Sequence, residues 1–108
     1  MANAWRVAGQ SDPSATTLTD AYTVPAAREF VGHVIVANRS ATPTAFRISL
    51  APNGAADANS QYIAYDVPIG ANDVYTSPKF GIDATDKVRV YATLATLSFT
   101  VTGVEKTA

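Results

Sequence analysis

Apolar and polar residues alternate along several short segments of the chain, which is the pattern of β-strands with one face buried and one face in water. Residues 44–50 are an example, because Phe46, Ile48 and Leu50 point to one face and the two residues between them are polar. The same alternation predicts half-buried antiparallel strands at residues 44–50, 61–67, 87–92 and 97–102.

Two segments lead to predictions about particular side chains. Within residues 61–67, Ile63, Tyr65 and Val67 are expected to share one face. Residues 30–37 are apolar on both faces. A strand of that kind is either central and covered on both sides or covered by a neighbouring subunit.

Weaker strand signals near residues 5–7, 17–23 and 74–77 bring the number of predicted strands to about eight. Helix signals are nearly absent, because Pro or Gly interrupts most stretches that are long enough. We therefore expect an all-β fold, a single-domain, two-sheet antiparallel β-sandwich of jelly-roll or Greek-key type over residues 1–108. Residues 1–10 are expected to form either an N-terminal arm or an edge strand.

A faint internal repeat is compatible with such a sandwich. The sequence AYTVP at residues 21–25 recurs as AYDVP at residues 64–68, and each copy is followed by similar strand and turn segments. Two similar halves packed face to face would produce this repeat. Chance repetition in a β-protein rich in Ala, Val and Thr would produce it equally well.

Charge and composition restrict the function. The chain has 8 basic and 9 acidic residues and a formal net charge of −1, which argues against partners such as nucleic acid or a membrane surface. It has no Cys and a single His, so disulfides, thiol nucleophiles and zinc fingers are excluded. Because no nucleophile motif or phosphate-binding glycine loop is present either, we expect no enzyme, no cofactor and no catalytic or metal-binding residues. The N-terminal residues do not resemble a signal peptide.

Two groups of residues leave alternatives open. Asp83 and Asp86 are spaced closely enough to bind a hard cation, although Asp in turns usually accepts hydrogen bonds from its own backbone. Several aromatic residues could stack on a sugar, but core or interface positions are the commoner role for such residues. These aromatic residues are Trp5, Tyr62, Tyr75 and Tyr91.

Most of the chain resembles small structural proteins of bacteriophage virions. The resemblance covers residues 9–18 (GQSDPSATTL), 22–26, 34–39, 46–49, 61–67, 71–73 and 86–92. It implies a non-enzymatic structural protein of a tailed phage particle that is assembled in the bacterial cytoplasm, where the lack of Cys is expected. The tail side (neck, baseplate or fibre attachment) is favoured slightly over capsid decoration on the head. Residues 76–80 depart from the family pattern, and Pro78 is expected to bend or end an edge strand there.

Such a protein would bind other virion proteins, including further copies of itself, through its sandwich surfaces; a trimer would be ordinary. The second face of the strand at residues 30–37 is the first interface candidate, and a second group is predicted to point outward from neighbouring strands. An N-terminal segment around Trp5 could reach a neighbouring chain. The interface candidates are Trp5, Val31, His33, Ile35, Arg47, Arg89 and Tyr91. The alternative from another class is a carbohydrate-binding module for host attachment.

Overall fold

The computed structural model describes residues 4–107, which form nine β-strands and two short 3-10 turns. Residues 1–3 of the expected N-terminal arm lie outside the described part, and residues 4–10 belong to an edge strand. The elements are β1 (Ala4–Ser11), β2 (Thr19–Thr23), β3 (Arg28–Asn38), β4 (Thr44–Ala51), η1 (Pro52–Gly54), η2 (Asn59–Gln61), β5 (Tyr62–Ile69), β6 (Val74–Thr76), β7 (Phe80–Asp83), β8 (Lys87–Ala92) and β9 (Leu97–Thr107).

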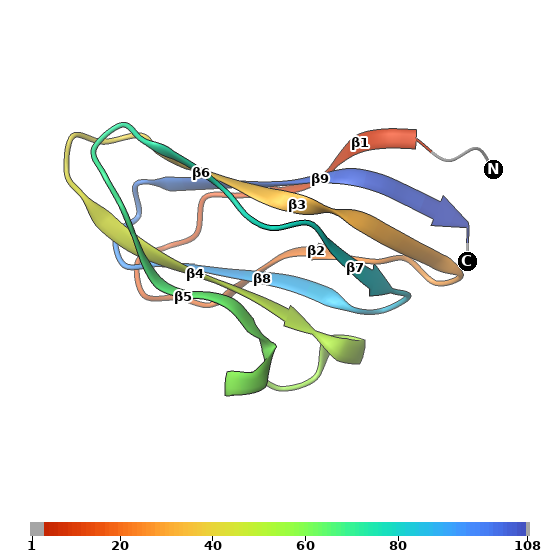
Figure 1. Ribbon diagram of the computed structural model, residues 1–108. Coiled ribbons are helices and arrows are strands. Elements are labelled where there is room, and N and C mark those ends of the chain that lie inside the picture. Colours follow the sequence, from red (N-terminus) through yellow and green to blue (C-terminus); the bar gives the residue numbers. More distant parts are fainter. Residues whose placement is uncertain (1–3, 108) are drawn as a thin grey trace.

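The strands form two antiparallel sheets packed face to face, which confirms the predicted β-sandwich (Figure 1). Sheet A has the order β1-β9-β3-β6, with β7 also paired to β3, and sheet B has the order β2-β8-β4-β5. Both β6 and β7 pair with β3, so they occupy one strand position that is interrupted in the middle. With these two counted as one strand, eight strands form two four-stranded sheets in the order of a jelly roll, and the chain changes sheet after every strand except between β4 and β5.

The interruption between β6 and β7 follows from the residues around Pro78. Strand β6 ends at Thr76 and β7 begins at Phe80, as expected for a proline that cannot donate a ladder hydrogen bond. Ser77 bridges the gap, because the Val34 N–H donates to Ser77 Oγ at 2.8 Å and the Ser77 N–H donates to the Val34 carbonyl at 2.9 Å. Pro78 was expected to bend or end an edge strand, and β6 does end before it, but β7 itself was not predicted.

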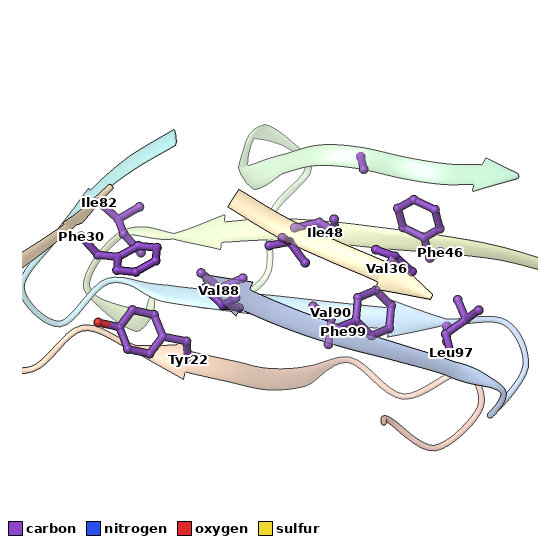
Figure 2. Packing of buried hydrophobic residues seen from close by; sticks show 14 of the residues in the cluster. Tyr22, Phe30, Val36, Phe46, Ile48, Ile82, Val88, Val90, Leu97 and Phe99 are labelled. Atoms are coloured by element: carbon purple, nitrogen blue, oxygen red, sulfur yellow. The ribbon is translucent and has the colours of Figure 1, made fainter. Parts of the chain in front are cut away.

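The core lies between the sheets and consists of inward residues at alternate positions (Figure 2). Val88, Val90, Phe46 and Ile48 from sheet B are fully buried there, as their alternation predicts. Phe99 of sheet A meets Phe46 with ring centroids 6.2 Å apart, so the two sheets are joined by aromatic contacts as well as by aliphatic ones.

One prediction about a strand face is wrong. Ile63 and Tyr65 of β5 are 38% and 55% exposed, whereas Ala64 between them is buried. The backbone at Asp66 has a φ of 51°, and the pairing between β4 and β5 shifts register beside it. This bulge reverses the alternation, so Val67 packs against the core although Ile63 and Tyr65 point outward.

The two copies of the internal repeat lie in similar places but differ at the tyrosine. They belong to β2 and β5, the two edge strands of sheet B, and in both copies the Ala and Val side chains pack against the core. Tyr22 of the first copy is buried in the core, whereas Tyr65 of the second is exposed. The repeat therefore matches in position but not in the burial of its tyrosine.

The open side between the edge strands β1 and β2 is closed by a buried carboxylate. Glu105 of β9 is 8% exposed and accepts hydrogen bonds from the Tyr22 hydroxyl at 2.6 Å and from Arg6 Nη1 at 3.2 Å. These bonds satisfy a charge that would otherwise be costly to bury. Burial, together with the neighbouring Glu105, raises the pKa of Tyr22 far above its ordinary value.

Candidate functional site

The outer surfaces of the two sheets carry all the predicted interface residues. In each antiparallel pair, residues directly opposite one another point to the same face, so the registers define which side chains share a surface. The outer face of sheet A, which we call the Trp5 face, contains Trp5, Val7, Gln10, Val31, His33, Ile35, Ala37, Val74, Thr76, Ser98, Thr100, Thr102 and Val104.

The Trp5 face is apolar or weakly polar over its whole centre. None of its residues is Asp, Glu, Lys or Arg, and the charges on this side lie at its two ends. Glu29, Asp83 and Lys106 share a row at one end, and Asp12 and Arg39 line a hollow with Gln10, Ser98 and Thr100 at the other. Trp5, Val7 and Val74 are 73%, 55% and 59% exposed. Trp5 and Val7 lie on one edge strand and Val74 on the opposite one, with the half-buried residues of β9 and β3 between them. Exposed large apolar side chains around an uncharged surface are typical of surfaces that bind a partner.

The structure brings four predicted interface residues together on this face. Val31, His33 and Ile35 project from β3 on the side opposite the core and are half-buried by their neighbours. Trp5 lies in the same row as Val31, because Val104 pairs with both of them. The strand at residues 28–38 is thus covered by the core on one side and open on the other.

The outer face of sheet B carries a cluster built around one arginine. The Arg47 guanidinium carbon lies 4.2 Å from the centre of the Tyr65 ring and 4.4 Å from that of Tyr91. Its Nε donates to Asp66 Oδ1 at 2.7 Å and its Nη2 to Asp66 Oδ2 at 3.4 Å. The bond to Asp66 raises the pKa of Arg47, so its charge is fixed. The guanidinium is held by two rings and a carboxylate at once.

A second tyrosine extends this cluster toward the segment between β4 and β5. The Tyr62 and Tyr65 rings meet edge to face, with centroids 5.1 Å apart and planes at 89°. The Tyr62 hydroxyl donates to Asp57 Oδ2 at 3.1 Å, and burial together with this bond raises the pKa of Tyr62. A shallow hollow lined by Asn59, Tyr62 and Tyr65 lies beside the rings. We call Arg47, Tyr62, Tyr65, Asp66 and Tyr91 the tyrosine–arginine cluster.

Arg89 lies on the same outer face but holds the protein's own backbone. Its side chain is 14% exposed, and it donates to the carbonyls of Ala55 at 2.6 Å and Gly54 at 3.1 Å. It also bonds Asp20, which Lys87 contacts at 2.8 Å. The hydrogen bond from Lys87 is the main reason that the pKa of Asp20 is lowered. Arg89 thus fastens the segment between β4 and β5 to sheet B.

The aspartates considered for a cation site are occupied by backbone groups. Asp86 Oδ1 accepts the Asn53 N–H and its Oδ2 accepts the Asp83 N–H, both at 2.9 Å. Asp83 Oδ1 accepts the Ala84 N–H at 2.8 Å. Within residues 4–107 no three His, Asp or Glu side chains are placed so that they could hold a metal ion together. The geometry is that of a hydrogen-bonded turn.

The aromatic residues considered for sugar binding are divided between three environments. Trp5 lies on the outer face of sheet A, Tyr62 and Tyr91 lie on that of sheet B, and Tyr75 faces the core with its ring 4.9 Å from Phe46. Tyr65 is not among the predicted outward residues, because the alternation pattern assigned it to the same side as Val67. No sequence signal marks Asp66 as the residue that reverses the pattern.

Comparison of the chain with protein-family models, with curated proteins and with solved structures finds no match. Among residues 4–107, no helix has the length and apolar character needed to cross a membrane. The two outer faces are therefore the observations on which a function can be built.

Proposed function

We propose that this chain is a non-enzymatic structural protein of a tailed bacteriophage virion and that it binds other virion proteins, among them further copies of itself, through the Trp5 face. The observation that carries the proposal is the uncharged centre of that face, together with Trp5, Val7 and Val74, which remain largely exposed on its two edge strands. A monomer gains nothing from such a surface, whereas a partner that covers it removes apolar area from water.

Two further observations support the virion assignment. The sequence resembles small virion proteins over residues 9–104. The jelly-roll strand order is also common in viral capsid proteins, although the same order occurs in lectins and cupins. Fold analogy alone does not identify a function, so the proposal depends mainly on the exposed face.

The Trp5 face is smaller than a typical protein interface. On β3 it runs from Val31 to Ala37, and it is four strand positions wide. At about 3.3 Å per residue and about 4.8 Å per strand position, these residues cover roughly 440 Å². A typical specific interface buries about 800 Å² on each partner. A stable partner would therefore also cover the ends or an edge of sheet A.

The first test compares the mass of the protein in solution before and after a charge is introduced on the face. We expect light scattering to show an oligomer for the unchanged chain and a monomer for Trp5→Glu. Trp5 is 73% exposed, so its replacement leaves the core intact. Ile63→Glu, which adds the same charge to an exposed position on sheet B, is the matched control and should remain an oligomer. If the unchanged chain is monomeric and does not bind virion proteins, this assignment of the Trp5 face is wrong.

The second test locates the protein on intact particles of the phage that encodes it. An antibody to the chain should label the neck, baseplate or fibres if the tail-side version holds. Label on the head would instead support the alternative, a decoration protein that holds capsid subunits together. An abundant protein in the lysate with no label on virions would refute both versions.

A further inference from the structure

The tyrosine–arginine cluster is ordered and exposed in a way that folding does not explain. Tyr65 is 55% exposed, and its contacts with Arg47 lie at the surface, where ion pairs and cation–π contacts add little stability. Yet the rings, the guanidinium and the carboxylate hold one another in fixed positions. A surface that is arranged before a ligand arrives loses less entropy when it binds one.

The backbone is distorted to build this arrangement. Neighbouring residues of a strand normally point to opposite faces, but Tyr65 and Asp66 both contact the same arginine. The φ of 51° at Asp66 makes this possible. Unfavourable backbone conformations of this kind occur preferentially at functional sites, and here the distortion places Tyr65 and Asp66 on one arginine while Val67 still packs against the core.

We propose that the tyrosine–arginine cluster binds a neutral saccharide, with one sugar ring seated in the hollow formed by Tyr62, Tyr65 and Asn59. The perpendicular rings of Tyr62 and Tyr65 provide a floor and a wall for a ring-shaped ligand. The C–H face of a sugar packs on an aromatic ring, and its hydroxyl groups require donors and acceptors around the rim. The Asn59 amide, the Asp57 carboxylate and the tyrosine hydroxyls supply both kinds of group.

The charges around the hollow favour a neutral ligand. The charge of Arg47 is compensated by Asp66 at 2.7 Å, and Asp57 is a further carboxylate on the rim. Arg47, Asp66 and Asp57 carry one positive and two negative charges, which disfavours phosphate groups of a nucleic acid and other anionic ligands. An organic cation would compete for the Tyr65 ring with Arg47, whose guanidinium carbon lies 4.2 Å from the ring centre. A ligand without charge meets neither disadvantage.

A peptide bound as an extra strand fits the same surface poorly. Strand β5 is the free edge of sheet B, and an edge strand is the usual place for a peptide to pair. However, Pro68 lacks an N–H, and the bulge at Asp66 interrupts the row of backbone groups. Both features block the pairing of a further strand. The side chains rather than the backbone are the groups that this edge presents.

The experiment is a titration of the full chain with neutral oligosaccharides, followed by calorimetry and by ligand-observed NMR. The panel consists of chitotetraose, maltoheptaose, cellohexaose and mannopentaose, with a heparin-derived oligosaccharide as the anionic comparison. We expect at least one neutral oligosaccharide to bind. Tyr65→Ala should weaken that binding about tenfold or more, the usual effect of removing an aromatic residue from the centre of a site. Tyr65→Phe, which keeps the ring, should bind almost as well as the unchanged chain.

Trp5→Ala is the matched control, because it removes an exposed aromatic ring from the opposite sheet and should leave saccharide binding unchanged. The proposal is overturned if no neutral oligosaccharide binds at millimolar concentration, if only the heparin fragment binds, or if Tyr65→Ala binds as tightly as the unchanged chain. NMR spectra of each variant verify that it is folded. Since this site and the Trp5 face lie on different sheets, failure here leaves the proposed virion role intact.

Discussion

The substitution Ser77→Ala tests whether the Ser77 hydroxyl stabilises the interrupted edge of sheet A. The Val34 N–H is a donor of the central strand β3, and its partner is Ser77 Oγ at 2.8 Å. Pro78 follows directly, and its carbonyl accepts the Ser77 hydroxyl at 3.0 Å. The serine side chain thus replaces the backbone acceptor that a regular edge strand would supply. Ser77→Ala removes this acceptor and leaves the rest of the ladder in place.

The cost follows from the burial of both groups. Val34 is 0% exposed and Ser77 is 6% exposed, so water cannot take the place of the hydroxyl. A buried donor without a partner costs about 1–3 kcal/mol. For a domain of this size, each kcal/mol lowers the melting temperature by roughly 4–8 °C. We therefore expect Ser77→Ala to melt about 5–20 °C below the unchanged protein.

The assay combines urea unfolding with hydrogen exchange of the Val34 amide measured by NMR. The amide should exchange faster in Ser77→Ala, and the free energy of unfolding should fall by the amount given above. Thr76→Ala, at the neighbouring exposed position of β6, is the control and should have a much smaller effect. The reasoning fails if Ser77→Ala is within about 0.5 kcal/mol of the unchanged protein and the Val34 amide remains equally protected.

Three further predictions concern the fold and the cluster. Gly32→Ala should cost about 1–3 kcal/mol of unfolding free energy in urea titrations, because its Cβ would lie 2.2 Å from the Thr102 carbonyl oxygen; Gly81→Ala, whose nearest neighbour would be 3.9 Å away, should be nearly neutral. The pKa of Tyr22 is raised above its ordinary value of 10.0, so its stabilising effect is complete below about pH 10 and is lost at higher pH. Urea titrations on either side of that pH should therefore show a steeper loss of stability in the unchanged protein than in Tyr22→Phe. Tyr65→Ala should lower the stability measured by thermal unfolding by no more than about 1 kcal/mol. A larger loss would mean that the cluster is ordered because it stabilises the fold.

The alternation of residues predicts the strands of this protein because nearly every strand has one buried and one exposed face. Residues 87–92 show the correspondence most clearly, since the strand has the predicted bounds and buries Val88, Val90 and Ala92. Alternation does not predict where pairing continues beyond the apolar residues. Strand β9 runs to Thr107 because β3 pairs with it over its whole length, and β1 pairs with residues 99–105 on the other side.

The parts that were missed depend on local backbone geometry. Only four residues form β7, and these are too few to show a period after a proline. The orientation of Tyr65 depends on a positive φ at Asp66. Asp adopts this conformation more readily than most residues, but an Asp in the sequence does not by itself predict it. As a result the sequence led to Arg47 and Tyr91 as outward residues and missed the partners that make them a cluster.

The two outer faces differ in chemistry and lie on opposite sides of the molecule (Figure 1). The Trp5 face is broad and uncharged, whereas the tyrosine–arginine cluster is small, polar at its rim and beside a hollow. Sheets in a sandwich pack with about 10 Å between them, so a chain that covers the Trp5 face cannot also cover Tyr65. A protein attached to a particle through sheet A would consequently hold sheet B toward the solvent. In that arrangement the same small domain would bind the particle on one side and surface glycans of the host on the other. Glycan binding would give the distorted strand β5 a role that assembly alone does not supply.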